Sequence, residues 1–160
     1  MFERKIAFAV GAVAWLACAT AQQGPGLGVP ATPEQGAGWD IRIGPDGAGL
    51  PAGSGTAAAG KVVYEAKCLA CHGVDGAGQP NDRLAGGQGT LREAAPIRTV
   101  GSYWPYATTV FDYVRRAMPL DTPGSLTDNE VYAVTAFLLA ANQVIPMTVT
   151  LDSASLVAVT

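Results

Sequence analysis

The pattern of apolar positions predicts a buried helix near the end of this 160-residue chain. Val131 to Ala141 is apolar almost all round, as in a helix that other elements cover on every side. Thr127 and Glu130 stand before this run with the spacing of a capping box, which marks a helix N-terminus. A run of eleven residues is too short to cross a membrane.

Two further helices are expected. Good helix formers run from Thr56 to Cys71, and Gly60, Tyr64 and Cys68 recur every four positions, so they share one helix face. A shorter helix from Thr108 or Thr109 to Ala117 ends at the dipeptide Met118-Pro119. Between them, residues 73–107 are rich in Gly and Pro and predict loops.

Strict alternation predicts extended structure in two places. Trp39-Asp40-Ile41-Arg42-Ile43 has the pattern of a half-buried strand. The tail, residues 146–160, alternates in the same way. Residues 22–60 contain eleven Gly and five Pro among 39 positions, which is typical of an irregular arm. Trp39 suggests that this arm packs on its own domain or on a partner.

The first 21 residues have the pattern of a secretory signal. Arg4 and Lys5 precede the apolar run from Ile6 to Ala19, and Ala19-Thr20-Ala21 supplies a small-residue cleavage site. An apolar run of this length is shorter than the about 20 residues of a bilayer span. We therefore expect export to the periplasm with cleavage after Ala21, an uncleaved anchor being the alternative. Nothing after residue 21 has the length of a membrane span.

The net charge and the cysteine residues narrow the range of possible functions. The formal net charge of −3 provides no basic footprint for nucleic acid. Cleavage removes Cys18 and leaves Cys68 and Cys71. In an oxidising compartment two cysteines at this spacing form a disulfide, a metal site or a cofactor attachment.

The pentapeptide Cys68-Leu-Ala-Cys71-His72 favours the last of these, because C-x-x-C-H is the attachment signature of c-type haem. Two cysteines three positions apart reach the two vinyl groups on one side of a porphyrin, and the next histidine binds the iron. A zinc site needs about four ligands, whereas His72 is the sole histidine. A thioredoxin-like pair needs a βαβ context, which the pattern lacks. A structural disulfide leaves His72 unexplained.

A six-coordinate haem needs a second axial ligand, and no second histidine is present to provide it. Met118 lies 46 residues after His72, in a turn-rich loop before the last helix, where its thioether can reach the opposite haem face. Met147 lies in the tail. We expect His72 and Met118 to ligate the iron, since His/Met ligation suits an electron carrier. An open distal site would instead indicate a peroxidase or gas sensor.

Other polar side chains have two interpretations. Arg98 and Trp104, with Tyr103 and Tyr106, either reach the haem propionates or are core aromatics beside a surface arginine. Arg115 and Arg116 either mark a docking rim around the haem edge or form a solvated helix face.

The arrangement of Gly60, Tyr64, the C-x-x-C-H motif, Met118 and an apolar last helix resembles class I cytochromes c over about residues 56–143. The resemblance implies an all-α fold around one covalent haem c, in which the first and last helices cross at a small residue. Gly60 would then face Tyr132 or Ala136. In many such cytochromes the carbonyl of a proline orients the proximal histidine; here Pro80 is displaced, so which carbonyl meets His72 is open.

A narrower resemblance covers about residues 33–145, loops included. It is carried by Trp39-Asp-Ile41, by Gly44-Pro-Asp-Gly47 and by the segments from Thr99 to Pro119 and from Ser125 to Ala136. These segments resemble the monohaem cytochrome subunits of sulfite dehydrogenases and the haem domain of the Sox sulfur dehydrogenase. The Sox subunit typically has a second haem domain, so the single-haem type fits better.

The resemblance implies a partner, a molybdenum-cofactor dehydrogenase subunit in a heterodimer or heterotetramer, and a downstream cytochrome c or oxidase. The expected organisation is a signal peptide (1–21), a Gly/Pro-rich arm (22–55), a cytochrome c domain (56–145) and an extended tail (146–160). The chain itself shows no catalytic dyad, nucleophile or phosphate loop. A free shuttle to a terminal oxidase, or a haem sensor or peroxidase, are the alternatives.

Overall fold

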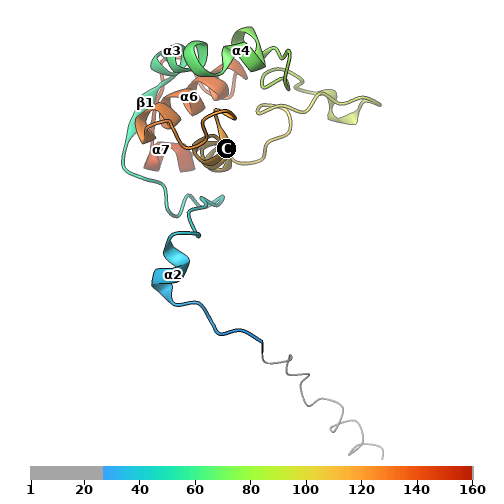
Figure 1. Ribbon diagram of the computed structural model, residues 1–160. Helices are drawn as coiled ribbons and strands as arrows, with labels where there is room; N and C mark the ends of the chain where they lie inside the picture. Colours follow the sequence, from blue (N-terminus) through green and yellow to red (C-terminus); the bar gives the residue numbers. More distant parts are fainter. Residues whose placement is uncertain (1–26, 160) are drawn as a thin grey trace, which may run out of the picture. The chain divides into compact units, whose positions relative to one another are not determined.

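The computed structural model describes residues 27–159 (Figure 1). The predicted signal segment and Cys18 lie outside these residues. The chain divides into two compact units, Met1–Asp40 and Ile41–Thr160. Among the described residues, no helix has the length and apolar character needed to cross a membrane.

The first unit contributes one short helix, α2 (Pro33–Ala37). Thr32 caps it, because its hydroxyl accepts from the Gln35 backbone N–H while the Gln35 side chain accepts from the Thr32 backbone. Pro33 stands at the first helical position, where its missing N–H costs nothing.

The second unit is helical, as expected from the sequence, with one small sheet. Its elements in chain order are β1 (Ser54–Thr56), α3 (Ala57–Lys67), α4 (Leu69–His72), the 3₁₀ turns η1 (Val74–Gly76) and η2 (Thr90–Arg92), α5 (Ala107–Ala117), α6 (Asp128–Ala141), β2 (Thr150–Asp152) and α7 (Ser153–Val157). Helices α5 and α6 agree with the expected bounds to within two residues, whereas the run expected as one helix from Thr56 to Cys71 is divided at Cys68 into α3 and α4.

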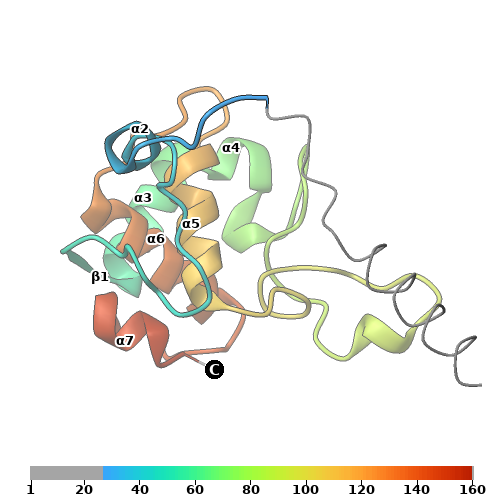
Figure 2. The same cartoon turned by 90° about the horizontal axis from the view of Figure 1, so that it is seen from below.

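Helix α6 forms the centre of this unit. It contacts α3, α5 and both strands, and each residue from Val131 to Leu139 is buried. The predicted capping box is present. The Thr127 hydroxyl accepts from the Glu130 backbone N–H, and the Glu130 carboxylate accepts from the Thr127 backbone N–H. Figure 2 shows α5 lying beside α6, with α7 below them.

Helices α3 and α6 cross at Gly60. A Cβ on Gly60 would collide with the Ala133 carbonyl and lie 2.9 Å from the Cβ of Phe137. The expectation that Gly60 faces Tyr132 or Ala136 is therefore wrong by one position along α6. Since α6 is buried all round, its sequence has no polar face that would fix which residues turn toward α3.

The second half of the predicted arm lies on α5. Ile43 is 2% exposed, and its backbone N–H donates to Asp112 Oδ1 at 2.8 Å. The Thr108 hydroxyl donates to the Pro45 carbonyl. No strand forms over residues 39–43, so that expectation is wrong. The Ile43 N–H bonds to a carboxylate on a helix rather than to a neighbouring strand.

The tail also differs from the expected extended form. Residues 150–152 form β2, which pairs antiparallel with β1, and Leu151 lies opposite Gly55. Asp152 then caps α7 by accepting from the Ser155 backbone N–H. Leu151 and Leu156 are almost completely buried. The tail is thus part of the core rather than an appendage.

The carboxylate of Asp112 gives this packing a pH dependence. Burial raises its pKa, but hydrogen bonds from Arg116 and from the Ile43 N–H outweigh this, and the pKa of Asp112 is lowered overall. A lowered pKa stabilises the folded state above the unfolded-chain value of about 3.9, and this stability is lost as the pH falls through the folded value.

We expect Asp112→Asn to lower the free energy of unfolding at pH 7 by about 1–2 kcal/mol, because the pairing with Arg116 is lost. The difference from wild type should shrink as the pH falls below about 4, because the unfolded chain then binds protons before the folded carboxylate, with its lowered pKa, does so. Urea unfolding between pH 3 and pH 7 measures both effects. Asp121→Asn, at an exposed site, is the control; a constant difference across this range would contradict the assignment.

Candidate functional site

The C-x-x-C-H motif lies at the end of the first helical segment. Cys68 terminates α3, and α4 carries Cys71 and His72 on its single turn. The His72 Nδ1 lies 2.8 Å from the Asp82 carbonyl oxygen. A carbonyl can only accept, so Nδ1 carries the proton and Nε2 keeps its lone pair. The open question of which carbonyl meets His72 is thus answered: Asp82, two residues after Pro80.

The loop that presents this carbonyl is tied back to the motif. The Asn81 N–H donates to the Cys71 carbonyl at 2.8 Å, and the Gly78 N–H donates to that of His72 at 2.8 Å. The Tyr64 hydroxyl donates to the Gly73 carbonyl at 2.7 Å. Burial raises the pKa of Tyr64 to about 12, so this donor keeps its proton at neutral pH.

The two cysteines are free thiols rather than a disulfide. Cys68 is partly buried against the core, whereas Cys71 is exposed. Burial raises the pKa of the Cys68 thiol to about 11, and the neighbouring Cys71 adds to the rise. Both sulfurs therefore remain available for a covalent bond to a third group.

Met118 directly follows α5 and turns the chain out of the helix with extended backbone angles. Its side chain is partly buried against the same core as Cys68, Leu69 and Leu84. Met147, in contrast, is 44% exposed. Of the two methionines that the structure describes, Met118 is the one packed against the core together with residues of the haem motif.

The aromatic residues before α5 make contacts of their own. The Trp104 indole N–H donates to the Thr109 hydroxyl at 2.7 Å, and its ring meets Tyr113 edge-on with centroids 5.7 Å apart. The Arg98 guanidinium lies over the Tyr103 ring at 5.4 Å. The indole N–H is thus already paired, and a role for Arg98 and Trp104 at haem propionates stays a prediction.

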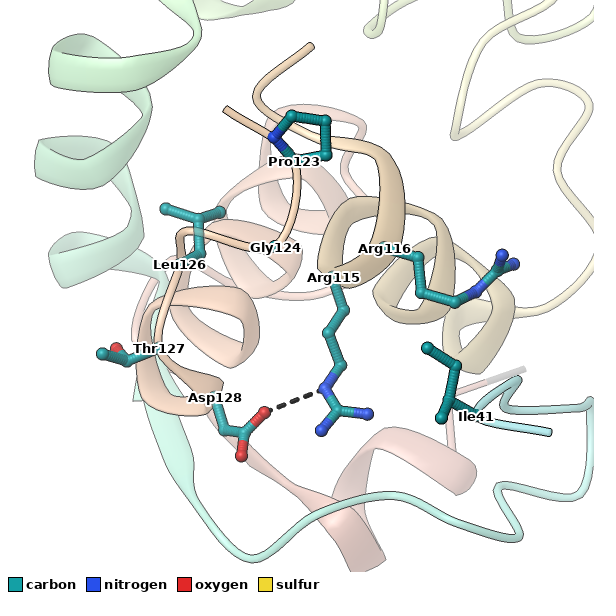
Figure 3. Close-up of a pocket in the computed structure, with 8 residues that line it drawn as sticks. All are labelled: Ile41, Arg115, Arg116, Pro123, Gly124, Leu126, Thr127 and Asp128. Carbon is teal, nitrogen blue, oxygen red and sulfur yellow. Dashed lines mark hydrogen bonds and ion pairs between the residues drawn. The ribbon is translucent and has the colours of Figure 1, made fainter. Parts of the chain in front are cut away.

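Arg115 and Arg116 are each paired with a carboxylate. The Arg115 Nε lies 3.0 Å from Asp128 Oδ1. The Arg116 guanidinium donates to both carboxylate oxygens of Asp112. Both arginines line a cavity of about 440 Å³, together with Ile41 and the segment that leads into α6 (Figure 3). Their charges are therefore balanced in part, and a docking role stays a prediction.

Asn142 is a buried residue whose side chain joins the end of α6 to the loop at residues 84–86, and the sequence patterns did not identify it. It is 3% exposed and follows the last residue of α6. Its side-chain N–H groups donate to the carbonyls of Leu84 and Leu138, and its Oδ1 accepts from the Gly86 N–H at 3.0 Å. Its position after an apolar run marks a helix end, but the contacts with a loop more than 50 residues earlier leave no signal in the sequence.

We expect Asn142→Ala to lower the free energy of unfolding by roughly 2–3 kcal/mol, because the buried Leu84 carbonyl and Gly86 N–H lose their partner. Hydrogen exchange should accelerate in residues 84–102 before it does in α6. Urea unfolding and peptide-resolved exchange test the two effects. Gln143→Ala, next to it but exposed, is the control; equal losses in both variants would show that Asn142 does not hold the loop.

Comparison with known proteins agrees with this geometry. Residues 57–142 match the model of the family described as cytochrome c, so the chain belongs to the cytochrome c family. Its cofactor is accordingly covalently bound haem c, and its role is that of an electron carrier. The matched residues extend from the first residue of α3 to the residue after α6.

The more particular relatives act on sulfur compounds. The chain is 41% identical to a chain in the crystal structure of the sulfane dehydrogenase SoxCD from Paracoccus pantotrophus, with a TM-score of 0.75, over 85% of this chain and 68% of the other. It is also similar to thiosulfate dehydrogenases of Stutzerimonas stutzeri (30% identity over 74% of this chain) and Allochromatium vinosum (33% over 50%). It spans only about a third of the length of these two enzymes.

The side chains present fit a covalently bound haem. Two unpaired thiols stand three positions apart in the chain, the spacing of c-type haem attachment, and the tautomer fixed by Asp82 leaves His72 Nε2 as a metal donor. Partly buried apolar side chains, Leu69, Leu84 and Met118, lie against the core beside them. This donor set matches the needs of a c-type haem.

Proposed function

We propose that this cytochrome is the periplasmic electron-transfer subunit of a molybdenum-dependent sulfite or sulfur dehydrogenase. The observation that carries the proposal is the extent of the match with the sulfane dehydrogenase, 41% identity over 85% of the chain. The family model covers only residues 57–142. The resemblance therefore includes residues before the haem domain, which general kinship among cytochromes c does not explain.

In this proposal each motif residue has one role. Cys68 and Cys71 would hold the haem through thioether bonds, and His72 would bind its iron through Nε2. Asp82 holds the His72 ring in place and strengthens its electron donation through the hydrogen bond to Nδ1. Met118 would be the second protein ligand of the iron, and Arg98 and Trp104 would bind the haem propionates.

Haem c supplies a one-electron couple, so the chain takes the electrons of a two-electron sulfur oxidation one at a time. The protein contributes fixed ligands: His72 is held by the loop that Tyr64 and Asn142 anchor. A rigid ligand set lowers the reorganisation that accompanies each electron transfer. The electrons then pass to a second cytochrome c or to an oxidase.

Two experiments test the proposal. The first uses protein matured in a host able to attach haem c: the colour should stay with the denatured chain during extraction with acidified organic solvent, and the double variant Cys68→Ala, Cys71→Ala should lose it. The second mixes the oxidised cytochrome with the molybdenum dehydrogenase from the same cells and adds sulfite or thiosulfate. Rapid reduction of the haem is expected; haem that only dithionite reduces would refute the partnership.

A further inference from the structure

The segment from Leu27 to Ile41 carries large apolar side chains on its surface. Leu27 is 87% exposed, Val29 90%, Trp39 89% and Ile41 50%. Helix α2, in the same segment, has no buried residue, although a complete capping box and a leading proline specify it. Local sequence signals therefore specify helix α2, although none of its residues is buried.

An exposed tryptophan such as Trp39 can contribute a large binding free energy when a partner covers it. Its side chain can bury 150–250 Å² of surface, roughly, and tryptophan is enriched among the residues that dominate protein interfaces. Pro30 and Pro33 restrict the backbone around α2, which reduces the entropy that this segment loses on binding. Both properties are those of a segment that contributes to an interface.

The comparison with the solved dehydrogenase includes part of this segment. A match over 85% of 160 residues, about 136, is longer than Ile41–Thr160, which holds 120 residues. Residues before Ile41 therefore have a counterpart in a chain of the sulfane dehydrogenase, outside the residues that the cytochrome c family shares.

The charged residues of this segment indicate which kind of partner it binds. Between Leu27 and Ile41 the charged residues are Glu34 and Asp40, both acidic. A segment that binds the anionic surface of a membrane carries lysine or arginine among its apolar residues. The absence of either from this stretch favours a protein surface over a lipid one.

We propose that residues 27–41 form a docking arm, in which Trp39 is the main anchor, for the molybdenum-cofactor subunit of the dehydrogenase. This inference rests on the proposed function and adds to it the part of the chain that binds the partner.

The test compares the binding of exported, haem-loaded variants to the isolated molybdenum subunit by titration calorimetry or surface plasmon resonance. Trp39→Ser should raise the dissociation constant about thirtyfold, the effect typical of an interface hot spot. The double variant Leu27→Ser, Val29→Ser should raise it several-fold. Val62→Ser is the matched control, since Val62 is a large apolar residue 67% exposed on α3. All variants should keep the wild-type haem spectrum and melting temperature.

The outcomes separate the arm from the partnership. If Trp39→Ser binds the dehydrogenase as tightly as wild type, the docking arm is disproved while the proposed function stands. If that variant instead loses self-association in the ultracentrifuge and binds the dehydrogenase normally, the arm joins copies of this chain and the proposal is equally overturned. If wild type itself does not bind the dehydrogenase, the proposed function fails, and the arm proposal fails with it.

Discussion

Replacing Met118 with Ala is expected to convert the cytochrome from a closed electron carrier into one that binds external ligands. Met118 ends α5 and lies partly buried against the same core as Cys68. Its thioether is the donor that we assign to the sixth position of the iron, and alanine offers none. Because the chain contains a single histidine, His72, no second imidazole can take its place.

Two measurements follow. The reduced variant should bind carbon monoxide at neutral pH, whereas the reduced wild type should not. Its reduction potential should fall by on the order of 100 mV, a fraction of the about 0.8 V over which axial ligands set haem potentials. The expected direction is downward, because methionine stabilises the ferrous state.

Met147→Ala is the matched control. Met147 is half-exposed and follows α6, so its loss should change neither the potential nor the affinity for carbon monoxide. If Met147→Ala opens the iron and Met118→Ala does not, the two roles are reversed. If neither does, the distal ligand is not a methionine of the described chain.

The second large effect is expected at the crossing of α3 and α6. Gly60→Val places two methyl groups where the Ala133 carbonyl and Phe137 already lie, so the helices must separate. Overpacking of this kind typically costs 1–3 kcal/mol, and a clash with backbone, which cannot move to another rotamer, stands at or above about 3 kcal/mol. That is a large share of the about 5–15 kcal/mol that keeps a domain folded.

The variant should therefore mature with little haem, and any holoprotein should unfold at a much lower urea concentration when followed by far-ultraviolet circular dichroism. Ala59→Val is the control: it places the same β-branched side chain on the exposed face of α3, one residue earlier. Its cost should stay near the about 0.5 kcal/mol of helix propensity. Similar losses in both variants would mean that helix propensity, rather than the close approach, decides stability.

The site shows which inferences a sequence can support. Cys68, Cys71 and His72 are neighbours in the chain, so the chemistry they imply needs no knowledge of the fold. The cap of α6 is equally local, since Thr127 and Glu130 are three residues apart, and the structure confirms it. The family match then confirmed the class I cytochrome c fold and its haem c.

Periodicity was a less reliable guide where apolar and polar positions did not separate into two faces. The continuous apolar run of α6 predicts a buried helix but leaves its rotation open, and the expected partners of Gly60 were wrong by one residue. The alternation of residues 39–43 and 146–160 includes Ile43 and Leu151, which are buried, but also Trp39 and Met147, which are exposed. It did not distinguish an isolated extended segment, a paired strand and a capped helix such as α7.

The sequence by itself determined the haem motif and helices α5 and α6, because each depends on residues within a few positions of one another, and it predicts an export signal on the same kind of local pattern. Only the tertiary structure decided that the Asp82 carbonyl meets His72, that Asn142 holds the loop at Leu84, and that Asp112 fastens Ile43. The physical reason is the same in all three cases. Each is a hydrogen bond between groups 10 to 69 residues apart, and such a bond forms only after packing of the core has brought the two segments together.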